Sequence, residues 1–336
     1  MKRFLNNIIL PVILGLASCS APSDEVVVYT SVDQVFSEPV LKDFEKETGI
    51  RVRAVYDTEE TKSTGVMNRL IAEKNNPQCD VFWSGDPVRN GVLLSKGITE
   101  PYQSKQTLLI PEHFREKDNH WIGFSARARV LIYNKNLIAA DSLPQSIFDF
   151  TDPAYKGQFA IANPLFGTTT FHIAALFMKL GDEKAKQWMN NMKANDAVIA
   201  ASNGDVKKRV MNGELAFGLT DTDDAFEAKK ESDNVDYIFL DQQKSSIGTL
   251  IMPNAVSLIK NSRNAENGKQ LIDYLLSRET EVKLAVSCAQ MPLIKGTPVP
   301  ENVPSLDKIK AMKIDYDKTS NKLEEIQPWL KQWAEK

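Results

Sequence analysis

Three aspartates within four residues form a dense group of potential ligand atoms in this 336-residue sequence. Asp221, Asp223 and Asp224 directly follow an apolar run that is typical of a strand. Carboxylate oxygens bind hard cations, and they also accept hydrogen bonds from amines or sugar hydroxyls. An EF-hand loop is excluded, because Ala225 and Phe226 stand where that loop requires an acid and a glycine. The group therefore predicts a cation or amine site or, alternatively, one helix cap with solvated neighbours.

A second group combines a glycine with hydroxyl side chains at the expected start of a helix. Gly167, Thr168, Thr169 and Thr170 precede the apolar stripe of that helix. Unpaired N–H groups, hydroxyl donors and the positive end of the helix dipole would together bind an anion. A threonine oxygen could instead simply cap the helix. We predict Gly167, Thr168 and Thr169 as ligand-binding residues, with N-capping as the alternative.

Two arginines lie on one face of an extended segment. Arg127 and Arg129 alternate with Ala126 and Ala128, so both guanidiniums project to the same side of the strand. Guanidiniums grip phosphate and carboxylate groups through paired N–H donors. Because such a residue is more often half of a structural ion pair, we expect at most one of the two to reach a ligand, and we choose Arg127.

The elements that must position these residues alternate between strands and helices. Strands are predicted at 26–29, 52–56 and 81–83, with amphipathic helices between them. This order is typical of a parallel sheet with crossover helices, in which ligands bind beyond the carboxyl ends of the strands. Polar side chains at all three strand ends are expected to line that crevice: Ser31, Asp57, Thr58 and Ser84.

Two long extended segments divide the chain into two α/β patterns. They run from Trp121 to Tyr133 and from Leu250 to Ile259, and a second strand–helix pattern lies between them. Two lobes joined by two crossing strands predict a cleft that opens and closes around a ligand. The predicted boundaries are 19–125 and 253–304 for the first lobe, 126–252 for the second lobe, and 305–336 for a C-terminal helical tail.

Residues 1–19 are typical of an export signal. Lys2 and Arg3 precede an apolar run at 8–16 that is too short to span a bilayer as a helix. The small residues before Cys19 resemble the bacterial lipoprotein signal, in which the cysteine becomes the lipidated first residue. We predict residues 1–18 as a signal peptide and Cys19 as the lipidation site, with an ordinary secretory signal as the alternative. The lipid would hold the chain in the periplasm or at the cell surface as its only membrane contact.

Composition and the absence of catalytic motifs exclude several classes of function. Charged residues make up 25% of the sequence, and no basic stripe occurs, so nucleic acid is not expected as a partner. No nucleophile elbow, His-Glu-x-x-His motif or lysine-bearing phosphate loop is present. We therefore predict a monomeric binding protein that is not an enzyme and holds no resident cofactor. Cys79 and Cys288 either form a disulfide or stay as buried free thiols.

Several segments, in order along the chain, resemble the periplasmic solute-binding proteins of the ferric-iron type. The similarity covers nearly all of the mature chain, and it rests on the segments 27–31, 156–162, 167–170, 203–205, 213–218 and 248–254. The resemblance implies a two-lobed type II periplasmic-binding-protein fold, which is α/β with mixed sheets, crossover helices and a two-strand hinge. It also implies delivery of the ligand to an ABC permease in the inner membrane.

The sequence departs from the ferric-iron type at the residues that would hold iron. In that family two tyrosines follow the strand that corresponds to 216–219, and here Asp223 and Asp224 take their places. The loop after the first strand has Ser31-Val32-Asp33 and lacks the iron-ligating histidine. The resemblance makes iron(III) the nominal transported ligand, with Asp223 and Asp224 as its metal ligands. The anion-binding groups predict the alternative, a small organic anion such as a phosphonate or a sugar phosphate.

Overall fold

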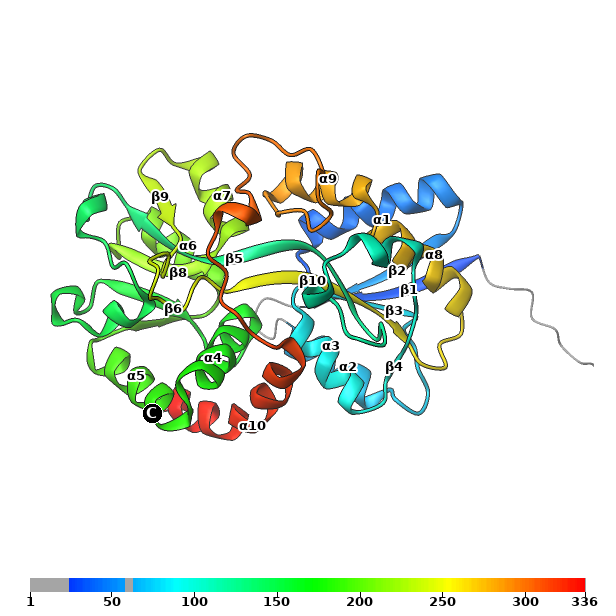
Figure 1. Ribbon diagram of the computed structural model, residues 1–336, viewed down its shortest axis with the longest axis horizontal. Helices are drawn as coiled ribbons and strands as arrows, with labels where there is room; N and C mark the ends of the chain where they lie inside the picture. Colours follow the sequence, from blue (N-terminus) through cyan, green and yellow to red (C-terminus); the bar gives the residue numbers. More distant parts are fainter. Residues whose placement is uncertain (1–23, 58–62, 336) are drawn as a thin grey trace, which may run out of the picture.

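The computed structural model describes residues 24–57 and 63–335. Figure 1 shows two lobes side by side, with the strands β5 (Ile122–Asn134) and β10 (Ile251–Ile259) crossing between them. These strands are the two extended segments predicted from the sequence. The predicted lipidation site Cys19 and the predicted ligand residue Thr58 lie outside the described residues.

The first lobe contains the parallel strands that the sequence predicts. β1 (Glu25–Thr30) pairs in parallel with both β2 (Arg51–Tyr56) and β3 (Val81–Ser84). The short β4 (Thr99–Glu100) pairs with β10. The helices of this lobe are α1 (Gln34–Thr48), α2 (Thr64–Ala72), α3 (Pro87–Ser95), α8 (Ala265–Leu275) and α9 (Arg278–Cys288).

The second lobe is built from the chain between the two crossing strands. β6 (Phe159–Ala162) is parallel to β7 (Val198–Ala200) and β8 (Phe217–Asp221), while β8 and β9 (Val235–Ile238) pair antiparallel with the second half of β5. The sequence patterns do not predict β7 and β9, because three or four residues are too few to show a period. The helices are α4 (Gly167–Leu180), α5 (Asp182–Ala194), α6 (Asn203–Met211) and α7 (Thr222–Glu231).

All strands of the described ranges belong to one mixed sheet. Its order is β2-β1-β3-β10-β5-β8-β6-β7, with β4 beside β10 and β9 beside β5. The first half of β5 thus belongs to the first lobe and the second half to the other. Short 3-10 helices fill the connections: Lys105–Leu109, Glu112–Phe114, Ala140–Ser142, Ile147–Thr151, Pro153–Tyr155 and Leu306–Lys308.

The pairing of the two crossing strands is interrupted at one point. β10 runs antiparallel to β5, and their register shifts between Pro253 and Asn254. On the facing strand, Ser125 has a φ of +40°, in the left-handed region that few non-glycine residues adopt. The buried Glu281 carboxylate accepts a hydrogen bond from the Ser125 N–H at 3.0 Å. The irregular backbone is therefore held in place by α9.

Helix α1 begins earlier than the sequence indicates. Its pattern predicts a start at Ser37, with Pro39 in the first turn, but the helix begins at Gln34 and contains Pro39. The hydroxyl of Ser37 does not cap the helix; it donates back to the carbonyl oxygen of Asp33 at 2.9 Å. Pro39 removes only one helical hydrogen bond, which the buried face of the helix compensates. Gly49, the residue that the sequence pattern indicates as the stop, has a φ of +77° and ends the helix.

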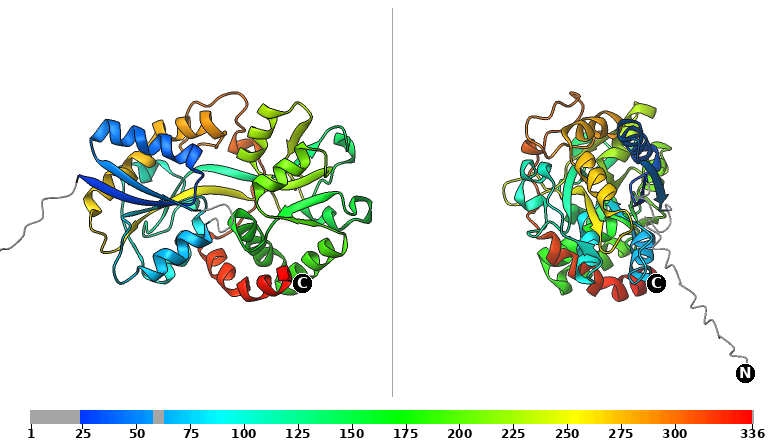
Figure 2. Two further views of the ribbon diagram at one scale, coloured as in Figure 1. Left: turned by 180° about the vertical axis from the view of Figure 1, so that it is seen from behind. Right: turned by 90° about the vertical axis from the view of Figure 1, so that its right-hand side faces the viewer.

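The C-terminal helix α10 (Tyr316–Glu335) contacts both lobes. It packs against α3 of the first lobe and α4 of the second, which Figures 1 and 2 show from opposite sides. An ion pair of Glu324 with Lys96 (2.7 Å) ties it to the first lobe, and one of Lys322 with Asp182 (3.1 Å) ties it to the second. The helix is continuous over Tyr316–Glu335, and Pro328 does not break it, because Leu330 and Trp333 beyond Pro328 are buried.

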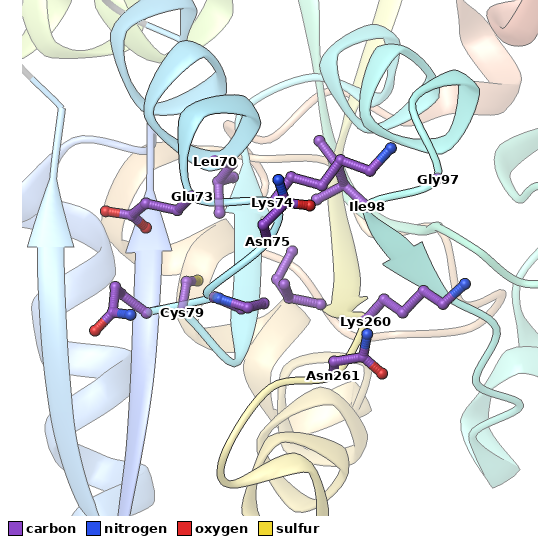
Figure 3. Close-up of a pocket in the computed structure, with 12 residues that line it drawn as sticks. Leu70, Glu73, Lys74, Asn75, Cys79, Gly97, Ile98, Lys260 and Asn261 are labelled. Carbon is purple, nitrogen blue, oxygen red and sulfur yellow. The ribbon is translucent and has the colours of Figure 1, made fainter.

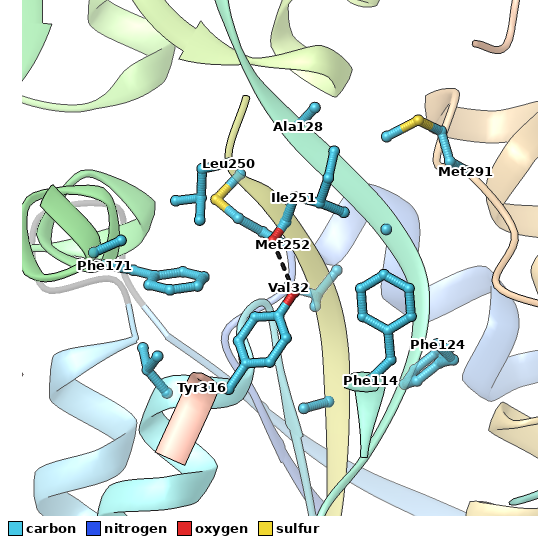
Figure 4. Packing of buried hydrophobic residues seen from close by; sticks show 14 of the residues in the cluster. Val32, Phe114, Phe124, Ala128, Phe171, Leu250, Ile251, Met252, Met291 and Tyr316 are labelled. Atoms are coloured by element: carbon cyan, nitrogen blue, oxygen red, sulfur yellow. Dashed lines mark hydrogen bonds between the residues drawn. The ribbon is translucent and has the colours of Figure 1, made fainter. Parts of the chain in front are cut away.

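The main hydrophobic cluster runs through both lobes past the crossing strands. Figure 4 shows Tyr316 of α10 with its ring between β10 and Phe171 of α4. The Tyr316 hydroxyl donates to the carbonyl oxygen of Ile251 at 3.1 Å, so the start of α10 is bonded directly to a crossing strand.

Cys79 and Cys288 are both buried free thiols. Of the two alternatives for this pair, the disulfide is therefore not formed. Across 24–57 and 63–335, no helix combines the length and the apolar character needed to cross a bilayer.

Candidate ligand-binding cleft

A cavity of about 670 Å³ lies between the two lobes, beside β5. The loops after β1, β2 and β3 line it from the first lobe, and the starts of α4, α6 and α7 line it from the second. The structure brings these predicted site residues together around it: Ser31, Asp57, Arg127, Gly167, Thr168, Thr169, Asp221, Asp223 and Asp224. Ser84 lies elsewhere; it is fully buried in the sheet, and its Oγ accepts a hydrogen bond from the Asp86 N–H at 3.3 Å.

Arg129 organises the second-lobe wall from behind the cavity. This residue is 2% exposed, and it is not among the described residues that line the cavity. Its Nη1 donates to Asp221 at 2.7 Å, to Thr168 at 3.1 Å and to Asn203 at 3.0 Å. Its Nη2 donates to the hydroxyl of Thr169 at 3.3 Å. One buried arginine thus joins the starts of α4 and α6 to the end of β8. Arg129 is the member of the arginine pair that forms a structural ion pair.

Arg127 is the arginine that faces the cavity. Its Nη1 lies 3.2 Å from a carboxylate oxygen of Asp223 and 3.5 Å from one of Asp221. Its Nη2 donates to the carbonyl oxygen of Gly85 at 2.5 Å. Burial by itself lowers the pKa of Arg127, but the adjacent aspartates outweigh burial and raise that pKa above its ordinary value. The guanidinium is therefore charged at every physiological pH.

The three aspartates approach each other closely enough to hold a metal ion. Asp221, Asp223 and Asp224 each offer one carboxylate oxygen, and these oxygens lie within 4.8 Å of one another. Together with the two arginines described above, however, the group carries one net negative charge rather than three. This balance weakens the attraction for a highly charged cation, and it suits a ligand that carries both signs or brings its own anions.

Two helix N-termini also face the cavity. The N-cap residue of α4 is Phe166, whose side chain accepts no capping hydrogen bond, so the threonines of its first turn do not cap it. At α6, Ser202 caps the N–H of Asp205 at 3.2 Å, and Asn203 and Gly204 begin the helix. First-turn N–H groups lack intrahelical acceptors, and here they stand beside hydroxyl groups. This wall can therefore donate several hydrogen bonds to an anion.

Gly85 and Asn203 are among the lining residues that the sequence analysis missed. Gly85 follows the end of β3 directly, one residue after the predicted Ser84. Asn203 contributes to the α6 side of the wall and donates through its amide to Asp221 at 3.2 Å. Gly85 has no side chain to suggest a role, and Asn203 lies in a segment that only the resemblance singled out.

A smaller cavity of about 260 Å³ lies within the first lobe, away from the cleft. Figure 3 shows Lys74 and Ile98 beside it and Lys260 at its far side. The Lys74 ammonium donates to the carbonyl oxygen of Lys96 at 2.5 Å, so this lysine serves the local packing. None of the predicted site residues is among the described residues that line it. The cleft is therefore the candidate site.

Two lobes, two crossing strands and a polar cavity between them define a two-lobed ligand-binding protein. Residues 40–313 match the family of bacterial extracellular solute-binding proteins, and the chain belongs to this family.

Individual relatives cover almost the whole chain. Iron uptake protein A1 of Synechocystis is 26% identical over 314 residues, which are 90% of this chain and 85% of that protein. A proposed 2-aminoethylphosphonate-binding periplasmic protein of Salmonella typhimurium is 25% identical over 98% of this chain and 93% of its own. The structure of iron-bound HitA from Pseudomonas aeruginosa matches with a TM-score of 0.84 at 22% identity, over 92% of this chain and 99% of that chain. The two-lobed fold predicted from the sequence is confirmed.

Proposed function

We propose that this protein captures a small ligand in the cleft between its lobes and presents it to the permease of an ABC importer. The observation that carries this proposal is the cavity of about 670 Å³, which both lobes line beside the strands that join them. Rotation about those strands would enclose a ligand. Capture and release need no bond chemistry, so we propose that the protein is not an enzyme, in agreement with its family.

We propose that the lobes meet at the predicted boundaries, 125/126 and 252/253. The first lobe then consists of 19–125 and 253–304, the second of 126–252, and a helical tail follows from 305. The left-handed φ of Ser125 and the register shift beside Pro253 support this assignment, because regular pairing is already interrupted there. Small changes in φ and ψ at these residues would rotate the lobes at low cost.

We also propose that residues 1–18 are removed on export and that Cys19 carries the lipid. The composition of that segment supports the proposal, and so does the family of extracellular proteins to which the chain belongs. The intact mass of protein extracted from membranes tests it: a chain that begins at Cys19 should carry the added mass of acyl groups. A chain cleaved elsewhere, without acyl groups, would contradict the assignment.

Iron(III) is the first ligand that we propose for the cleft. The Synechocystis relative is named for iron uptake, and three carboxylate oxygens lie within 4.8 Å of one another at Asp221, Asp223 and Asp224. Oxygen ligands suit hard, highly charged cations. Because Arg127 and Arg129 neutralise part of the carboxylate charge, iron would need further oxygen ligands from the first lobe or from solution.

A small organic anion, such as a phosphonate or a sugar phosphate, is the second candidate, and a separate observation favours it. The starts of α4 and α6 form one cavity wall, with the hydroxyls of Thr168 and Thr169 beside them. Arg127 adds a guanidinium on the neighbouring strand. The carboxylates opposite would then bind an amine or hydroxyl end of the same ligand, and the Salmonella relative is named for an aminophosphonate.

Thermal denaturation separates the two candidates. We would measure Tm with ferric citrate, citrate alone, 2-aminoethylphosphonate and glucose 6-phosphate, together with metal analysis and native mass spectrometry. A ligand at about one hundred times its Kd stabilises the folded state by about 2.7 kcal/mol, which raises Tm by roughly 5 °C in a protein of this size. A shift of this size in Tm is large enough to be measured reliably by thermal denaturation.

Two nearly isosteric variants locate the ligand. Asp224→Asn removes one charge from the carboxylate group, and Thr169→Val removes one hydroxyl from the start of α4. If iron is the ligand, its stabilisation should fall in Asp224→Asn and persist in Thr169→Val. Stabilisation by a phosphonate or sugar phosphate that falls in Thr169→Val would identify the anion, and it should fall in Asp224→Asn as well, because the carboxylates would hold the amine or hydroxyl end of that ligand. If none of these compounds raises Tm, neither ligand proposal holds.

A further inference from the structure

Arg127 forms hydrogen bonds to both lobes across the floor of the cleft. It lies on β5, where that strand still pairs with β10 and has not yet reached β8. One nitrogen of its guanidinium bonds to Gly85, between β3 and α3 of the first lobe. The other bonds to Asp223, in the first turn of α7 in the second lobe. Movement of the lobes away from each other must therefore lengthen at least one of these contacts.

The first-lobe contact depends on the absence of a side chain at Gly85. A Cβ atom at this position would lie 3.0 Å from Arg127 Nη2, so a larger residue would crowd the guanidinium and require it to shift by a few tenths of an ångström. The Gly85 peptide is also oriented from its other side, because its N–H donates to the hydroxyl of Ser31 at 3.0 Å. Ser31, Gly85, Arg127 and Asp223 thus form one chain of hydrogen bonds from lobe to lobe.

The second-lobe contact is a buried ion pair. Arg127 is 8% exposed, Asp223 is 5% exposed and Asp221 is 1% exposed, so water screens these charges little. A guanidinium can hold two acceptors in fixed directions because its donors lie in one rigid plane. A lysine ammonium at the same place has a shorter reach and lacks this planar fork.

We propose that Arg127 is a positioning residue that ties the lobes together and so sets how readily the cleft closes. This inference rests on the proposed capture function, but it concerns the empty protein. Closed conformations that already exist in the empty protein increase the apparent affinity, since binding energy is not used to bring the lobes together. Loss of the tie should shift the empty protein toward more open conformations and weaken ligand binding about tenfold or more.

Distances between spin labels on the two lobes test the proposal without any ligand. Labels at Lys46→Cys on α1 and Glu231→Cys on α7 occupy exposed positions. The native thiols at 79 and 288 are buried, and Cys19→Ser in all variants leaves the label on the introduced pair alone. Double electron–electron resonance should give longer and broader distances for Arg127→Met than for the unmodified arginine. Arg127→Lys should lie between the two.

Matched variants keep the result interpretable. Arg53→Met removes an exposed arginine whose ion pair with Glu25 stays within the first lobe, and its distances should equal those of the parent protein. Gly85→Ala displaces the guanidinium without removing its charge, and it should widen the distances even if Arg127→Met folds poorly. Unchanged distances in both Arg127→Met and Gly85→Ala would overturn the proposal. Unchanged distances with lost ligand stabilisation would make Arg127 a ligand contact only, which leaves the capture function intact.

Discussion

Replacement of Arg129 by methionine should destabilise the second lobe more than any exposed substitution. Arg129 is 2% exposed, and it donates hydrogen bonds to Asp221, Thr168, Asn203 and Thr169. Methionine keeps most of the apolar stem but leaves the Asp221 carboxylate without its shortest partner. Removing one member of a buried ion pair typically costs about 3–5 kcal/mol, because the remaining charge stays buried.

The lower end of that range applies here. Asp221 keeps the hydroxyl of Thr168 at 2.8 Å, the amide of Asn203 at 3.2 Å and the guanidinium of Arg127 at 3.5 Å. These groups compensate part of the lost interaction, so we expect a loss of about 3 kcal/mol. At about 2 °C per kcal/mol in a protein of this size, Tm should fall by roughly 6 °C.

Urea denaturation, followed by tryptophan fluorescence, measures the change. Arg53→Met serves as the control, because it removes an arginine of an exposed ion pair and should unfold like the parent protein. The double variant Arg129→Met with Asp221→Leu should recover part of the loss, since it removes the isolated carboxylate as well. A loss of less than about 1 kcal/mol in the free energy of unfolding of Arg129→Met would refute the reasoning. Such a small loss would mean that the Asp221 carboxylate does not depend on Arg129 for its stabilisation.

Further predictions concern other parts of the molecule. Burial, and then the charge of Arg129, hold the pKa of His172 well below its ordinary value, so the unfolded chain binds one more proton below about pH 6.5. Stability should therefore fall as the pH drops below that value, and His172→Gln should flatten the fall in urea titrations at pH 7 and pH 5. Ser125→Gly should raise the free energy of unfolding by about 1 kcal/mol by relieving its left-handed φ, and Ser125→Ala should not; equal effects would contradict the strain. A Cβ at Gly91 would lie 2.1 Å from Ser320 Oγ, so Gly91→Ala should lower stability by about 1–3 kcal/mol, and Ser320→Gly should restore part of it. A loss without recovery would mean that the contact with Ser320 does not cause it, which would contradict the prediction.

Local patterns were sufficient for the elements that carry the fold. Both crossing strands are long and buried along their whole length, so their apolar runs are visible in the sequence. The strand–helix alternation of the first lobe predicted its parallel pairing, and the strand ends predicted where the cavity would lie. The position of Ser84 shows how precisely strand ends locate the cavity lining. Its side chain still belongs to the sheet, and the chain reaches the cavity one residue later, at Gly85.

The partners of the charged residues could not be predicted in the same way. Arg129 and Asp221 are 92 residues apart, and Arg127 and Asp223 are 96 apart. Alternation along β5 showed that both arginines share a face, but only the pairing of β5 with β8 brings the aspartates opposite them. From the sequence, the aspartates therefore predicted a cation site with its full negative charge. In the fold, two guanidiniums already neutralise most of that charge.

The central position of β10 has a consequence for the order in which the molecule folds. β10 lies between β3 and β5, and it pairs Leu258 with Val81, far away in the sequence. The second lobe is continuous in the chain and can form early, whereas the sheet of the first lobe stays incomplete until β10 arrives. During that interval β3 presents an unpaired edge, the kind of surface on which strands of other molecules assemble. A chain that emerges N-terminus first therefore remains vulnerable to aggregation until about three quarters of it is available.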